Sequence, residues 1–216
     1  MVYFVLVAAG IVSGAFCFAL VYRSEITEDA EKPLNRKHLL IYSIIAAVIN
    51  VAVACIAKTV FHESIFEILR ILALLAVLWA CAWTDKKSFL IPNIVLLLGL
   101  LVCILFFAVE CFIAPDSLRY NIFSALAAAT AVLIISLLCR LISPNAIGFG
   151  DVKLMMLMGL YLRFGRMWSA MLFSVIVAFV YSIFLVVVKK ANRKTEMPFA
   201  PILLAGTMLS LILSTV

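Results

Sequence analysis

The feature that most constrains the fold is a succession of apolar stretches, several of them about 20 residues long. A helix needs roughly 20 apolar residues to cross the hydrocarbon core of a bilayer. The chain is 67% hydrophobic and only 13% charged, whereas about a quarter of the residues of a typical soluble domain are charged. A soluble domain could not bury so much apolar surface. The sequence therefore predicts an all-α fold, a polytopic transmembrane helical bundle.

About eight spans are expected, with no second domain. The first stretch has neither a basic n-region nor a small-residue cleavage signal, so we expect a retained span rather than a signal peptide. The longest polar stretch, residues 23–38, is too short to form a core of its own, and residues 1–216 are expected to form one integral-membrane domain. The expected spans are 2–22, 38–60, 65–83, 90–113, 120–142, 152–164, 167–188 and 199–216.

The basic residues predict the orientation of these spans. Counted over alternate sides, twelve of the 17 Lys and Arg residues fall on one side, and the positive-inside rule places that side in the cytoplasm and both termini outside. Lys58, Arg70, Arg119, Arg163 and Arg166 fall on the other side. The twelve are Arg23, Lys32, Arg36, Lys37, Lys86, Lys87, Arg140, Lys153, Lys189, Lys190, Arg193 and Lys194.

The distribution of charge argues against a nucleic-acid partner, and the spacing of cysteines and histidines argues against a metal site. The net charge is +6, but the basic residues lie in short loops between apolar runs, so topology accounts for them and no nucleic-acid partner is expected. The six cysteines form no C-x-x-C pair, and His38 and His62 are predicted on opposite sides. We therefore expect neither a metal site nor a cofactor.

Two aspartates border apolar segments and are the main candidates for chemistry. Asp85 follows the span 65–83, and Asp151 opens the span after Gly148-Phe149-Gly150. A carboxylate at the edge of a membrane span is costly to keep there, which makes it a functional candidate. Both are predicted on the cytoplasmic side. The alternatives are a helix cap for Asp151 and a juxtamembrane charge cluster for Asp85.

Glycines and prolines surround these aspartates. Gly148 and Gly150 allow left-handed or extended backbone angles and the close approach of another backbone. Pro92 suits the first turn of the helix that follows Asp85. Pro198 and Pro201 are expected to hold an extended or loosely wound backbone where the last span begins.

Taken together, these segments resemble the type IV prepilin peptidases, the leader peptidases of the GxGD membrane aspartyl protease group. The resemblance runs over nearly the whole chain in the same order, and Ala200 replaces a glycine of the family's P-F-G-P segment. The opening Ser13-Gly14-Ala15-Phe16 to Val21-Tyr22-Arg23 is similar to the family's first span. The matching segments are Asp85 with Ile91-Pro92-Asn93, Gly148-Phe149-Gly150-Asp151-Val152-Lys153-Leu154, and Pro198-Phe199-Ala200-Pro201.

The resemblance implies an aspartyl endopeptidase in which Asp85 and Asp151 activate a water without a metal. Its substrates would be prepilin-like single-pass precursors, whose short basic leader is removed after a glycine at the cytoplasmic face of the cell membrane. The residues expected to bind substrate or shape the site are Gly148, Phe149, Gly150, Lys153, Pro92, Asn93, Pro198, Phe199 and Pro201. For Lys153, a solvated topological role is the alternative.

One departure from the family is informative. Many bacterial members carry two cysteine pairs in the loop after the first span, associated with methylation of the new amino terminus. Residues 23–38 contain no cysteine, which implies a peptidase without a methyltransferase module, as in short members that serve Tad-type or archaellin-like systems. Three other functions stay open at this point: a proton- or cation-coupled transporter, a non-catalytic assembly factor, and a protease of the presenilin-like branch.

Overall fold

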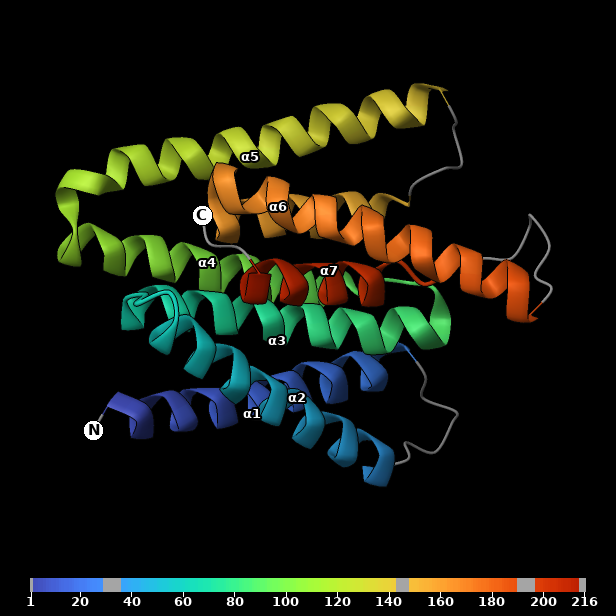
Figure 1. Ribbon diagram of the computed structural model, residues 1–216, viewed down its shortest axis with the longest axis horizontal. Coiled ribbons are helices and arrows are strands. Elements are labelled where there is room, and N and C mark those ends of the chain that lie inside the picture. The colour runs from blue at the N-terminus through green and yellow to red at the C-terminus, as the bar shows by residue number, and fades with distance from the viewer. Residues whose placement is uncertain (1, 29–35, 143–147, 190–196, 214–216) are drawn as a thin grey trace.

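The protein is a bundle of helices, as the apolar stretches predict. Its computed structural model describes residues 2–28, 36–142, 148–189 and 197–213, and these form helices and no strand (Figure 1). The centre of the predicted cytoplasmic loop, residues 29–35, lies outside the described residues, as do Lys190, Arg193 and Lys194. The helices are α1 (Val2–Glu28), α2 (Arg36–Thr59), α3 (Ile65–Ser88), α4 (Asn93–Ile113), α5 (Pro115–Ile142), α6 (Phe149–Lys189) and α7 (Ala200–Leu213).

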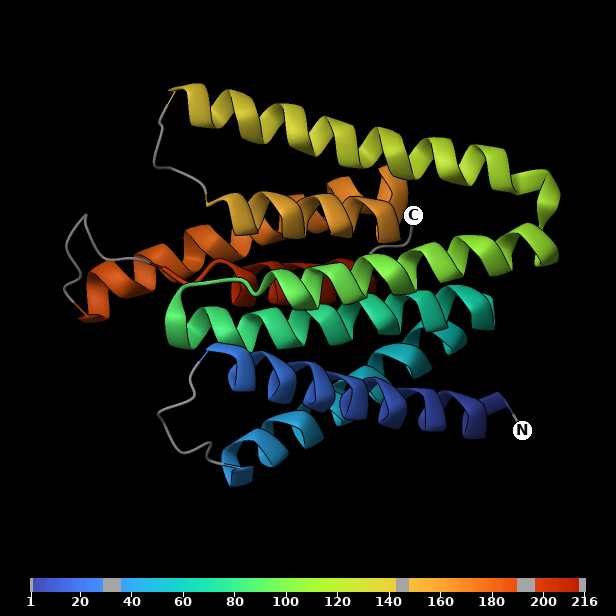
Figure 2. The ribbon, with the colours of Figure 1, turned by 180° about the vertical axis from the view of Figure 1, so that it is seen from behind.

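Helix α6 contains a chain reversal and so accounts for two of the predicted spans, 152–164 and 167–188. At Arg163 the backbone leaves the helical region, with φ 62° and ψ −179°. The second part of α6 then returns alongside α7. Two contacts show this: Ser169 hydrogen-bonds with Ser210 near one end, and Ser182 contacts Met197 near the other. Both views show the two parts of α6 running in opposite directions (Figures 1 and 2).

The outer surface of the bundle is that of a multi-pass membrane protein. Six of the helices are long and apolar enough to cross a membrane, whereas α7, with 14 residues, is shorter than a usual span. Large apolar side chains face outward, and Phe112 is 88% exposed. In water this exposure would be unfavourable, but in a bilayer lipid tails cover such side chains.

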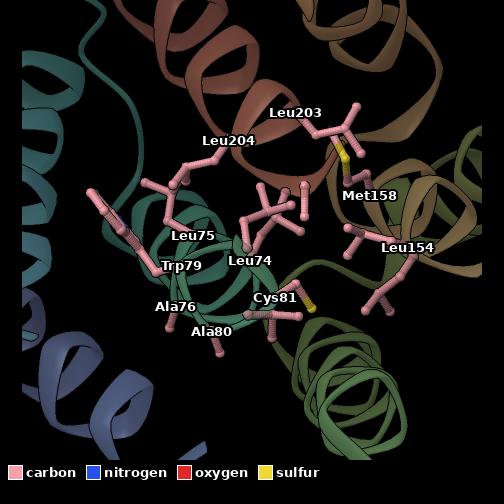
Figure 3. Packing of buried hydrophobic residues seen from close by; sticks show 14 of the residues in the cluster. Leu74, Leu75, Ala76, Trp79, Ala80, Cys81, Leu154, Met158, Leu203 and Leu204 are labelled. Atoms are coloured by element: carbon pink, nitrogen blue, oxygen red, sulfur yellow. The ribbon is translucent and has the colours of Figure 1, made fainter. Parts of the chain in front are cut away.

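Helix α3 is the centre of the packing. Its apolar residues are buried on all sides, and α1, α2, α4, α6 and α7 all contact it. Figure 3 shows Leu74 and Leu75 of α3 near Leu203 and Leu204 of α7 and Met158 of α6, with Trp79 on the side of α3 away from Met158. A helix that is apolar all round is expected in such a position. The last turn of α3, which carries Asp85, is therefore held by most of the bundle.

Small residues bring the surrounding helices close together. A Cβ on Gly159 of α6 would lie 3.0 Å from the backbone nitrogen of Ala129 on α5, and a Cβ on Gly206 of α7 would lie 2.4 Å from Cα of Ser174 on α6. Close approach at small residues is the usual way in which membrane helices associate. It fixes α6 and α7 against their neighbours.

The bundle has two ends of different character. At the site end, on the right in Figure 1, the turn from α3 to α4 meets the starts of α6 and α7. At the reversal end, on the left, α1 begins, α2 leads into α3, α4 leads into α5, and α6 reverses at Arg163. Asp85 and Asp151 are both at the site end.

Candidate active site

Asp85 lies in the last turn of α3 and not on a loop after the helix. The helix continues to Ser88, and Phe89 ends it in the left-handed conformation, where its N–H donates to the Asp85 carbonyl at 3.0 Å. Only 4% of Asp85 is exposed. Its Oδ2 accepts a hydrogen bond of 2.8 Å from the backbone N–H of Ala200, the first residue of α7. The carboxyl of Asp85 is therefore fixed by two helices far apart in sequence.

Asp151 lies in the first turn of α6, at the same end of the bundle. Its carboxyl is close enough to Asp85 for the two to interact electrostatically, and it lies beside Gly148. Both carboxyls are also close enough to interact electrostatically with the thiol of Cys81, which is fully buried one turn before Asp85. The structure thus brings together two carboxyls, that of Asp85 buried and that of Asp151 half-buried, beside buried apolar side chains.

The two glycines before Asp151 are explained by space rather than by unusual backbone angles. Neither Gly148 nor Gly150 has a positive φ, so a left-handed backbone at these positions is not found. A Cβ on Gly148 would lie 3.0 Å from Oδ2 of Asp151. A Cβ on Gly150 would lie 3.1 Å from Cβ of Ile91. Gly150 therefore lets the start of α6 approach the segment before α4, and Gly148 leaves room for the carboxyl of Asp151.

Asn93 and Lys153 hydrogen-bond with each other where α6 approaches α4. The ammonium of Lys153 donates to Oδ1 of Asn93 at 2.9 Å, joining α6 to the first residue of α4. Pro92 immediately precedes α4, one residue earlier than the first-turn position predicted for it. From this pair an otherwise apolar groove of about 440 Å³ runs between the two helices, with Leu97, Leu100 and Met156 in its walls.

Phe149 lies at the edge of the site and is 61% exposed. The guanidinium of Arg140, near the end of α5, lies 3.6 Å from the centre of its ring. A cation above an aromatic face is attracted by the ring's quadrupole. This contact holds the start of α6 against the end of α5.

The segment around Ala200 forms the other wall. Pro198 lies before α7, and Pro201 lies in its first turn, where a proline costs no helical hydrogen bond. The carbonyl of Phe199 accepts the N–H groups of Ile202 and Leu203 at 3.1 and 3.0 Å. These two bonds begin α7 and point the N–H of Ala200 at Asp85.

Sequence reasoning missed this N–H group. In the sequence, Ala200 stands out only as a replacement for a glycine of the family, but either residue supplies the N–H that Asp85 accepts. Its position between two prolines at a helix start was the available signal, because the first N–H groups of a helix have no partner within it. Among the residues that the structure describes, no group of three or more His, Cys, Asp or Glu side chains could hold a metal ion.

The fold and the site together define a class: a polytopic membrane helical bundle with two interacting carboxyls at one end. The model of the type IV leader peptidase family matches residues 72–187, more than half of the chain and including both aspartates. The chain belongs to this family, as the resemblance predicted.

One curated relative agrees with this assignment. It is the prepilin leader peptidase/N-methyltransferase of Bacillus subtilis (strain 168), which is 28% identical over 144 residues, 67% of this chain. The match covers 55% of that relative, so the chain spans about half the relative's length. No solved structure matches the chain.

Proposed function

We propose that the protein is an aspartyl endopeptidase that removes the short basic leader from prepilin-like precursors. The observation that carries the proposal is the meeting of Asp85 and Asp151, which lie 66 positions apart in the sequence, at one end of the bundle. The family membership supports a peptidase, and the relative from Bacillus subtilis is named for this activity.

The two carboxyls suit general acid–base chemistry. Two carboxyls that share a site cannot easily both be ionised, so one holds a proton while the other is charged. The charged carboxylate takes a proton from a water, whose oxygen bonds to the scissile carbonyl carbon, and the other carboxyl gives its proton to the carbonyl oxygen. The C–N bond then breaks: the leaving nitrogen takes the proton that the first carboxyl removed from the water, and the other carboxyl regains a proton from a hydroxyl of the tetrahedral intermediate as the carbonyl re-forms. The pair acts as a unit, and either aspartate fits either role.

The groove beside the site suits the apolar part of such a precursor. Its walls are mostly apolar, and its polar end, formed by Asn93 and Lys153, lies two residues along α6 from Asp151. A single-pass precursor with its helix in this groove would place the leader junction at the aspartates. By the positive-inside rule, the site end faces the cytoplasm and the protein lies in the cell membrane.

The proposal is tested by cleavage of a purified precursor that carries a short basic leader and an apolar helix. We expect Asp85→Asn and Asp151→Asn each to lower the cleavage rate by roughly 10²–10⁴-fold, the usual contribution of a general acid or base. Asp116→Asn, which changes an exposed carboxyl in the first turn of α5 at the reversal end, is the matched control and should cleave as the unaltered protein does.

Thermal unfolding in the same detergent shows whether each variant is folded. Cleavage retained by a folded Asp85→Asn or Asp151→Asn would contradict the dyad. Absence of cleavage by the unaltered, folded protein toward several precursors would favour a non-catalytic assembly factor.

A further inference from the structure

A second polar site lies at the reversal end, far from the aspartates. Here Glu67 of α3 forms ion pairs with three arginines, Arg70, Arg163 and Arg166. Arg163 also binds Glu110 of α4, with Nη2 2.6 Å from Oε1, and Arg166 binds Glu63. Such a cluster within a membrane protein is costly and is a functional candidate in its own right.

A cavity of about 500 Å³ opens beside this cluster. Arg70, Arg163 and Arg166 line it together with Glu67, and Asn121 and Ser124 of α5 add polar groups to its wall. The other two acids, Glu63 and Glu110, bind the arginines but are not among the lining residues. Three arginines and one glutamate thus line the cavity, while Glu63 and Glu110 behind them balance the charge of the cluster as a whole.

The buried arginine in this wall has donors without acceptors. Only 2% of Arg70 is exposed, and one of its nitrogens, Nη2, binds Glu67. Its Nε and Nη1, and Nε of Arg163, are buried and have no partner among the described residues. One acceptor, Oε2 of Glu110, is also unpaired. Buried guanidinium N–H groups rarely stay unpaired, so the cavity calls for an acceptor-rich anion.

The surroundings of the cavity indicate the source of that anion. Tyr120, which lines it, is 74% exposed, and just beyond Arg163 the rings of Phe164 and Trp168 pack edge to face with centres 5.8 Å apart. Exposed Tyr and Trp side chains are enriched where a membrane protein crosses the level of the lipid headgroups. Arginine forks match the geometry of phosphate oxygens.

We propose that this cavity binds a phosphate group, that of a phospholipid headgroup, through the guanidinium groups of Arg70 and Arg163, whose enclosed N–H groups would turn toward it. The bound phosphate would complete the hydrogen bonding of the arginines and stabilise the reversal at Arg163. Binding is independent of peptidase activity, so it can be measured whether or not the protein cleaves a precursor.

The test measures thermal unfolding of the whole protein in detergent with three additives. Dioleoyl phosphatidylglycerol should raise the unfolding midpoint by roughly 5 °C at about one hundred times its dissociation constant. Dioleoylglycerol, which has the same tails without the phosphate, and inorganic phosphate at matched ionic strength should not. A rise with dioleoylglycerol, or with free phosphate alone, would overturn the headgroup assignment.

Two variants show whether the cavity is responsible. Replacing Arg70 would leave Glu67 short of a partner and could unfold the protein, so we use Gly165→Phe. Gly165 lines the cavity, and apart from its chain neighbours and the backbone of its own helix no atom lies within 4 Å of where its Cβ would be. This variant should fill the cavity without removing a charge, and the shift with phosphatidylglycerol should disappear.

Arg119→Gln is the matched control, because Arg119 is an exposed cation on α5 at the same end but does not line the cavity. It should keep the full shift. A shift that survives Gly165→Phe, or that is lost equally in Arg119→Gln, would show general attraction to a basic surface and would contradict the proposal.

Discussion

At the scale of single residues, the contact most specific to the site is the hydrogen bond from the N–H of Ala200 to Asp85. It joins the first residue of one helix to the last turn of another, 115 positions apart. A hydrogen bond to a charged group contributes about 1.5–3 kcal/mol. The bond thus holds one of the two carboxyls in a single orientation, which catalysis by a positioned acid or base requires.

This contact predicts opposite results for two substitutions of Ala200. Ala200→Gly keeps the N–H, and we expect cleavage close to that of the unaltered protein. Ala200→Pro removes the N–H at a helix start, where proline is otherwise tolerated, and should lower the cleavage rate by roughly 10- to 100-fold. Cleavage of a precursor measures both.

Ala200 is fully buried, so the comparison is valid only if the unfolding midpoint of Ala200→Pro stays near that of Ala200→Gly. A folded proline variant that cleaves normally would show that Asp85 does not depend on this bond.

The arginines show where residue-scale reading of the sequence is insufficient. Arg163 and Arg166 fit the predicted topology poorly, since they lie between two apolar stretches on the side with fewer basic residues. In the structure, Glu67 lies within ion-pairing distance of both. These partners are about one hundred positions away, and no local pattern relates them.

At the scale of elements, the groove between α4 and the first part of α6 is the feature with a functional consequence. It exists because Gly150 lets Ile91 approach at one end, and because Tyr161 donates to the Gly99 carbonyl at 2.8 Å further along. These contacts hold the two helices at a fixed separation. The groove is therefore a preformed surface, as binding sites usually are.

If the apolar helix of a precursor lies in this groove, a bulky residue in its wall should act on long substrates only. We expect Leu100→Trp to lower cleavage of a precursor with its apolar helix by about tenfold or more, since filling a groove removes the binding energy that positions the junction. Cleavage of a short leader peptide without the helix should change little.

Leu138→Trp is the matched control, because Leu138 is an exposed leucine on α5 that does not line the groove. Equal loss on both substrates in Leu100→Trp would point to a distorted site. Normal cleavage of both would place the precursor's helix elsewhere.

At the scale of the whole molecule, the orientation of the bundle decides which compartment the aspartates face. The site end holds the turn from α3 to α4, with Lys86 and Lys87, and the reversal end holds Arg163 and Arg166, which are paired with acids. The positive-inside rule counts basic residues and not net charge, so the predicted orientation, with the site end in the cytoplasm, rests on the larger number of Lys and Arg residues at that end.

Labelling of single cysteines measures this orientation. In a background with the six native cysteines replaced, we expect Ser117→Cys, exposed at the start of α5, to react with a membrane-impermeant maleimide in intact spheroplasts. Ser88→Cys, exposed at the end of α3, should react only after the membrane is permeabilised. The reverse pattern would contradict cleavage at the cytoplasmic face.

The sequence alone predicts the helical membrane bundle, the family, and a break between two apolar stretches at residues 165 and 166, close to Arg163, where the structure reverses the chain. It could do so because these properties depend on the length of apolar runs and on short motifs, which are local. It also singled out Asp85 and Asp151 as the candidate pair, because a carboxyl beside an apolar span is recognisable without knowing its neighbours.

Which groups meet depends on the tertiary structure. The N–H of Ala200 on Asp85, the approach of Ile91 to Gly150, and the arginine cluster around Glu67 all join helices distant in the chain. The physical reason is that helix packing depends on how all the buried side chains fit at once, with α3 at the centre. No segment read alone contains that information.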